Sequence, residues 1–93
     1  MEKVFQCTSQ LTFDTTPSQH QQLLQIIKED NVGCLGIDLH QVTECDSAGL
    51  ALLIEAKRLC KQYHKSLWIS GASADMLALA EFCGVDGLIN DRQ

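Results

Sequence analysis

The most informative stretch of this sequence is CLGIDLHQVTECDSAGLALLIEAKRLCKQY, residues 34–63. It begins with a mostly apolar run, Cys34 to Leu39, which is typical of a buried strand in a parallel sheet. From about Asp46 to Tyr63 the apolar residues recur with helical spacing. A buried strand followed by a long helix is the unit from which α/β folds are built, so this stretch predicts an α/β domain.

Shorter patterns on either side predict the other helices and strands. Thr16 can cap a helix, Pro17 suits its first position and Gln19 completes a capping box, so a helix should start here. Ser73 can cap a third helix. The remaining strands are expected at residues 4–7 and 11–13, as a hairpin or a bent edge strand, at residues 67–69 and at Leu88-Ile89.

The order of these elements defines the expected architecture. The chain has the length of one domain, contains no internal repeat or linker, and is 45% hydrophobic and 20% charged, as globular proteins are. We predict one α/β domain over residues 1–93, with a small mixed sheet of four to five strands and about three helices packed mainly on one face.

Composition and charge exclude several classes of function. The net charge of −5 argues against binding to nucleic acid or to an anionic membrane surface. The N-terminus does not resemble a secretory signal, and no apolar stretch approaches the about 20 residues that cross a bilayer. We therefore expect a soluble, cytoplasmic protein that does not insert into a membrane.

The sequence predicts neither a disulfide framework nor a metal or cofactor site. Five cysteines form an odd set without a C-x-x-C pair, and we expect them to be reduced core residues. They are Cys7, Cys34, Cys45, Cys60 and Cys83. The histidines are too scattered to predict a metal site, and no nucleotide-binding loop, zinc-protease motif or calcium loop occurs.

The predicted helix at 46–63 has two distinct faces when each residue advances about 100°. With Ala56 at its centre, the core-facing stripe contains Gly49, Leu52, Leu53, Leu59, Cys60 and Tyr63. The opposite face contains Ser47, Leu50, Ala51, Ile54, Arg58 and Lys61. Leu50 and Ile54 would form an apolar patch beside Ser47, which either binds a partner protein or is covered by a neighbouring helix or the N-terminal segment.

Charges near the end of this helix have two interpretations. Lys57, Arg58, Lys61 and Lys65 lie within nine positions. They would complement the helix dipole at its C-terminal end, or they would form a basic contact surface for a partner.

The segment from Cys45 to Gly49 resembles the nucleophile elbow of hydrolases only in part. Its first glycine is absent, and no histidine is tied to Ser47 as a base, so we expect no catalytic residue. Ser47 still has two possible roles. A phosphate there would be stabilised by the helix dipole and would spoil an apolar contact, which makes Ser47 a switch, or Asp46 or Ser47 simply caps the helix.

These residues also carry a family resemblance. Gly36-Ile37-Asp38-Leu39, Val42 and the run Cys45-Asp46-Ser47-Ala48-Gly49-Leu50-Ala51-Leu52-Leu53 resemble the STAS domain family over nearly the whole chain. The resemblance implies a four- or five-stranded mixed sheet with helices, in which the D-S-x-G segment opens the second helix. It also implies a non-enzymatic protein that acts by binding partners.

Two branches of the family imply different partners. In the MlaB-like branch, a small cytoplasmic subunit binds the ATPase of an ABC transporter that maintains outer-membrane lipid asymmetry, and the residue matching Ser47 lies at that contact. In anti-sigma factor antagonists, a partner kinase phosphorylates the matching serine. Three features favour the first branch: the opening segment at residues 10–17, the Leu50-Ala51-Leu52-Leu53 run, and the residues at positions 48 and 51. The second branch more often has Ser or Thr in place of Ala48 and a glycine near Ala51.

The resemblance therefore implies a docking surface and no cofactor on this chain. Nucleotide and magnesium would belong to the ATPase, and the chain would lie at the inner membrane only through the transporter complex. The expected partner-binding residues are Asp46, Ser47, Ala48, Gly49, Leu50, Ala51, Ile54 and Arg58.

Overall fold

The computed structural model describes residues 1–7, 9–84 and 87. Three helices and five strands follow one another along the chain. In order they are β1 (Glu2–Gln6), β2 (Gln10–Leu11), α1 (Thr16–Ile27), β3 (Cys34–Asp38), β4 (Glu44–Cys45), α2 (Ser47–Gln62), β5 (Ser66–Ser70) and α3 (Ala74–Phe82).

The strands form two small sheets. One has three strands in the order β1-β3-β5 and the other pairs β2 with β4. Every strand pair among the described residues is parallel. The structure described therefore has two small parallel sheets in place of the expected single mixed sheet. The predicted α/β class, with five strands and three helices, is confirmed.

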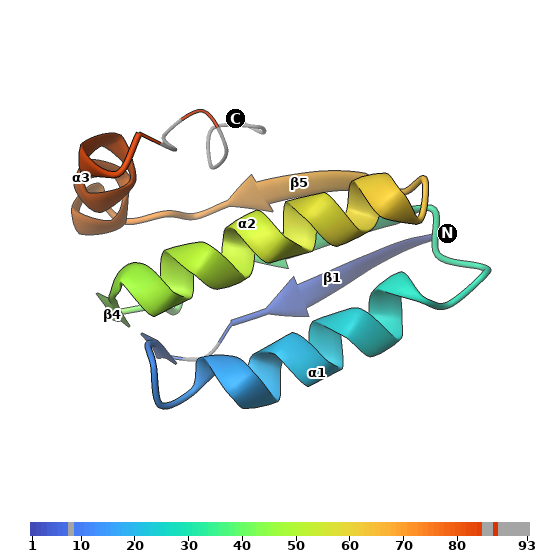
Figure 1. The fold of residues 1–93 in the computed structure, drawn as a ribbon, viewed down its shortest axis with the longest axis horizontal. Helices are drawn as coiled ribbons and strands as arrows, with labels where there is room; N and C mark the ends of the chain where they lie inside the picture. Colours follow the sequence, from blue (N-terminus) through green and yellow to red (C-terminus); the bar gives the residue numbers. More distant parts are fainter. Residues whose placement is uncertain (8, 85–86, 88–93) are drawn as a thin grey trace.

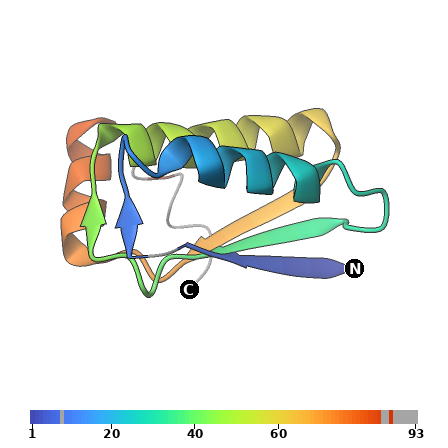
Figure 2. The same ribbon diagram turned by 90° about the horizontal axis from the view of Figure 1, so that it is seen from below.

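The long helices lie on one side of the three-stranded sheet, as predicted. α1 and α2 run side by side above β1, β3 and β5, and α3 lies across the end at which α2 begins (Figures 1 and 2). The sheet face toward the helices carries Leu35, Ile37 and Ile69, which are fully buried. On the other face, Trp68 packs directly over Gly36, where a Cβ would overlap the indole ring.

The first two strands do not form a hairpin. Each pairs in parallel with a later strand, so that β1 is an edge strand and β2 lies in the separate small sheet. A hairpin is excluded because β1 pairs with β3 and β2 pairs with β4, both of which follow α1 in the chain. The predicted strand at Leu88-Ile89 lies outside the described residues.

α1 starts as predicted, but its capping differs. Thr15 is the N-cap residue, Thr16 is the first helical residue, and no side chain caps the helix. Gln19 does not complete a capping box, because its amide turns inward and donates a hydrogen bond to the carbonyl oxygen of Gln10 at 3.2 Å. The turn before the helix is held by Thr15, whose hydroxyl oxygen accepts from the backbone N–H of Thr12 at 3.0 Å.

The predicted faces of α2 are wrong at two positions. Leu50, expected on the outward face, is only 2% exposed and belongs to the same core cluster as Met76 and Ala80 of α3. Leu50 lies about 120° from Ala56 on the helical wheel, at the edge of the outward face, so a small extension of the core on that side is enough to bury it. Tyr63, expected in the core, caps the end of the helix and is 37% exposed.

The cysteines are free thiols that follow the prediction in part. Cys7 and Cys60 are buried, and burial raises the pKa of the Cys7 thiol to about 12. Cys83 is exposed just after α3, so it is not a core residue. Among residues 1–7, 9–84 and 87, no helix combines the length and apolarity that a membrane crossing needs.

Candidate functional site

The start of α2 is organised by the carboxylate of Asp46. Asp46 is the N-cap residue, and its Oδ1 accepts a hydrogen bond from the backbone N–H of Gly49 at 3.1 Å. Its Oδ2 accepts from the backbone N–H of Phe13 at 3.0 Å. The bond from Phe13, followed by those from the first turn of α2, lowers the pKa of Asp46. Asp46 therefore ties the loop after β2 to the start of α2.

Gly49 allows this end of α2 to approach β2 closely. A Cβ at residue 49 would overlap the carbonyl oxygen of Leu11 and would lie 2.9 Å from the Sγ of Cys45. The backbone N–H of Asp46 also donates to the Leu11 carbonyl oxygen, at 3.3 Å. Close packing against β2 therefore requires glycine at position 49, and no bound ligand is needed to explain it.

Ser47 is the first residue of α2 and is exposed. Its hydroxyl makes no hydrogen bond to any residue that the structure describes. Asp46, the adjacent carboxylate, is oriented by backbone N–H groups, so it is not positioned as a base for Ser47. The arrangement presents the hydroxyl of Ser47 to the surface.

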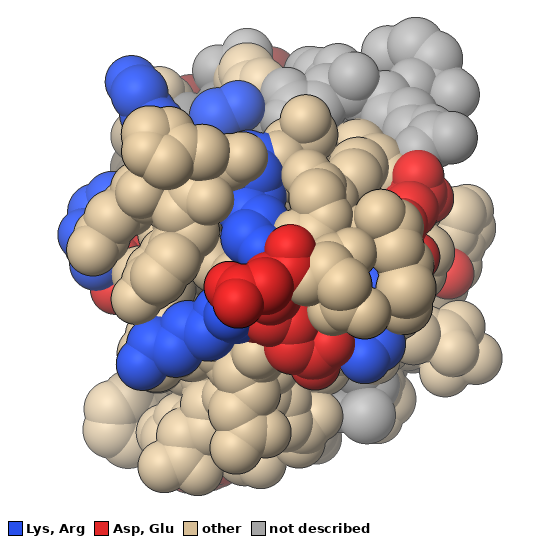
Figure 3. Space-filling view, turned by 90° about the vertical axis from the view of Figure 1, so that its right-hand side faces the viewer, with Lys and Arg blue, Asp and Glu red and all other residues tan. Residues whose placement is uncertain are grey.

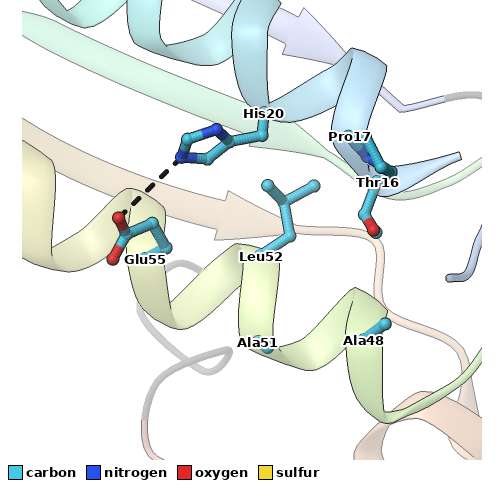
Figure 4. Close-up of a pocket in the computed structure, with 7 residues that line it drawn as sticks. All are labelled: Thr16, Pro17, His20, Ala48, Ala51, Leu52 and Glu55. Carbon is cyan, nitrogen blue, oxygen red and sulfur yellow. Dashed lines mark ion pairs between the residues drawn. The ribbon is translucent and has the colours of Figure 1, made fainter.

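A groove opens between the first turns of α1 and α2, beside Ser47. It has a volume of about 330 Å³ (Figure 4). Thr16, Pro17 and His20 line it from α1, and Ala48, Ala51, Leu52 and Glu55 line it from α2. The small side chains of Ala48 and Ala51 leave this space open. The lining is mainly apolar.

Charged side chains close one end of the groove. The guanidinium of Arg58 donates two hydrogen bonds to the Glu55 carboxylate, at 2.7 and 2.8 Å, and they lower the pKa of Glu55. His20 Nε2 lies 3.8 Å from Glu55 Oε2, across the space between the helices (Figure 4). The contact between His20 and Glu55 joins α1 to α2 at the surface.

The structure divides the eight residues expected at a docking surface into two groups. Ser47, Ala51, Ile54 and Arg58 are exposed on α2, with Asp46 and Ala48 half-buried beside them. Gly49 and Leu50 are buried, so they support this surface from below and cannot contact a partner directly.

Sequence reasoning missed the contribution of the first helix and its preceding loop. The aromatic ring of Phe13 is 76% exposed, beside Asp46. Thr16, Pro17 and His20 line the groove. Of these residues, only Phe13 could have been suspected from the sequence, because an aromatic residue between a short strand and the start of a helix can be exposed. Thr16 and Pro17 were recognised as helix-start residues and as part of the opening segment at residues 10–17, and His20 only as a scattered histidine.

The described residues contain no cluster of three or more histidine, cysteine or acidic side chains arranged to hold a metal ion. The groove contains one carboxylate, Glu55, and that carboxylate is already paired with Arg58.

Comparisons with known proteins agree with this geometry. A family model described as Mlab, STAS domain matches residues 2–90. Comparison with curated proteins finds no match. Among solved structures, the chain is similar to the anti-sigma factor antagonist SpoIIAA in its unphosphorylated form, with a TM-score of 0.81 and 14% identity over 99% of this chain and 80% of that one.

Two further structures share the fold. A sulfate transporter family protein from Wolinella succinogenes has a TM-score of 0.78 and 17% identity, covering 98% of this chain and 74% of that chain. SLC26A9 has a TM-score of 0.74 and 16% identity, covering 95% of this chain and 17% of that one. At these identities the likeness concerns the fold.

Proposed function

The chain belongs to the STAS domain family, and from this membership we propose that it is a non-catalytic adaptor subunit that binds the ATPase of a phospholipid-transport ABC complex. The match to a family model described as Mlab, STAS domain supports this branch of the family. The ATPase would hold nucleotide and magnesium. The adaptor would be cytoplasmic and would reach the inner membrane through the complex.

The observation that carries the proposal is the exposed surface at the start of α2. Ser47, Ala51 and Ile54 are exposed beside the groove, and two of these side chains are small enough for a partner backbone to approach closely. Ile54 is 43% exposed, so its apolar side chain is available for a partner to bury. A partner that packs on this surface would bury the hydroxyl of Ser47.

Paired substitutions of Ser47 test this role by co-purification with the ATPase. Ser47→Thr adds one methyl group and should retain the complex. Ser47→Glu places a charge in the contact and should abolish it. Both variants should melt near the wild-type temperature, because Ser47 is exposed. Retention of the complex by Ser47→Glu would remove the reason for placing the contact here.

A second candidate is an anti-sigma factor antagonist controlled by phosphorylation of Ser47. Its support is the exposure of Ser47 at a helix N-terminus, where unpaired N–H groups and the helix dipole favour a phosphate. Intact-mass measurement after incubation with a neighbouring-gene serine kinase and ATP distinguishes the two candidates. A phosphate on Ser47 and binding to the kinase, without binding to the ATPase, would replace the first candidate by the second.

A further inference from the structure

Lys and Arg side chains are confined to one part of the described structure. All its Lys and Arg residues lie near the ends of α1 and α2, in the second half of α2 or at the starts of β1 and β5. They are Lys3, Lys28, Lys57, Arg58, Lys61 and Lys65. Figure 3 views the end where α1 and α2 finish and shows Lys and Arg side chains gathered around a few acidic ones.

The opposite end, where α1 and α2 begin, carries acidic side chains and no Lys or Arg among the described residues. Asp14, Glu44 and Asp46 line one hollow together with Phe13. Asp14 and Glu44 are exposed, and neither forms a salt bridge with a described residue. No described Lys or Arg side chain pairs with these two carboxylates, so they are available to a cationic surface.

An apolar contact surface lies directly beside this acidic hollow. Phe13 projects into solvent from a turn fixed by Asp46 and by Thr15. On α1 the groove begins at Thr16, two residues after Asp14. On α2 it begins at Ala48, two residues after Asp46. A partner that entered the groove at this end would therefore pass near Asp14, which lines the same hollow as Glu44.

We propose that this end of the molecule binds a basic helix of its partner. One aliphatic side chain of that helix fills the groove between α1 and α2, and Lys or Arg side chains on either side of it pair with Asp14 and Glu44 and pack on the ring of Phe13. The identity of the partner rests on the proposed function. The chemistry of the partner helix does not, because it follows from the charge and shape of this chain.

Calorimetric titration with the purified ATPase at low and high salt tests the pairing. Asp14→Asn and Glu44→Gln together should weaken binding about fivefold at low salt and much less at high salt. Asp30→Asn, an exposed carboxylate at the other end, is the matched control and should bind as wild type does. Ala51→Leu should fill the groove and weaken binding about tenfold or more, whereas Ala78→Leu on the exposed surface of α3 should not.

The variants separate this inference from the proposed function. Wild-type binding that is indifferent to Asp14→Asn, Glu44→Gln and Ala51→Leu would overturn the inference and leave the proposed function standing. Absence of any wild-type binding to the ATPase would overturn the proposed function. In that case a peptide titration decides the inference alone.

The peptide titration follows backbone amide shifts of the isotope-labelled chain by NMR. Two short helical peptides carry the same leucine, flanked one turn away on each side by Arg in one peptide and by Glu in the other. The Arg peptide should shift the amides of Phe13, Ser47 and Ala51, and the Glu peptide should not. Equal effects of the two peptides, or shifts confined to other parts of the chain, would overturn the inference.

Discussion

Two residues of the D-S-x-G segment have structural roles that the sequence alone left open. Asp46, and not Ser47, is the helix cap, and its second oxygen holds the loop that carries Phe13. Gly49 is required by the backbone of β2. The residues that flank Ser47 are therefore explained by packing and capping, and Ser47 itself remains available to a partner.

Replacing Gly49 by alanine should destabilise the fold. The new methyl group would overlap a backbone carbonyl, which cannot move as a flexible side chain could, so the cost should be about 1–3 kcal/mol. Gly33→Ala is the control, because a Cβ there meets nothing within 4 Å. Urea unfolding measures both variants. A Gly49→Ala protein as stable as Gly33→Ala would show that α2 does not pack on β2 as described.

The cap formed by Asp46 should make stability depend on acid pH. Its pKa is lowered in the folded state, so its contribution is present above the unfolded value of 3.8 and is lost as pH falls through the folded pKa. Asp46→Asn should be less stable than wild type at pH 7, and the difference should shrink below pH 3.8. Asp30→Asn is the control. A difference between wild type and Asp46→Asn that stays constant down to the acid transition would contradict this role.

At the scale of elements, α2 shows both the reach and the limit of sequence periodicity. Its ends were predicted correctly, because Asp46 caps it and its apolar residues recur through the last turn. The face of Leu50 was predicted wrongly, because the wheel describes one helix against one sheet, whereas the core cluster that contains Leu50 also includes residues of α3. β4 was not predicted at all, since a two-residue strand is too short for any pattern.

Charge substitutions on α2 distinguish its buried and exposed positions. Leu50→Asp should cost several kcal/mol, because it places an unpaired charge in the core. Ile54→Asp should change stability by no more than about 0.5 kcal/mol. Thermal melting measures both. Normal melting of Leu50→Asp would mean that Leu50 is not buried in the core as described.

At the scale of the whole molecule, the sequence predicted the class of fold better than the site. Alternation of apolar strands and helices along the chain is sufficient for an α/β domain with helices on one face. The groove depends on how closely α1 packs against α2, which involves Pro17, His20 and Ala48 from two distant segments. The confinement of Lys and Arg side chains to one part of the described structure likewise appears only when the chain is folded.

The central claim is that the start of α2 is the surface that binds the ATPase. Site-specific photo-crosslinking tests it most directly, with a photoreactive phenylalanine analogue at position 54 and, as the control, at position 78 on the exposed surface of α3. Mass spectrometry would identify the crosslinked protein in the purified complex. We expect a crosslink to the ATPase from position 54 and none from position 78. A crosslink from position 78 with none from position 54 would contradict this claim.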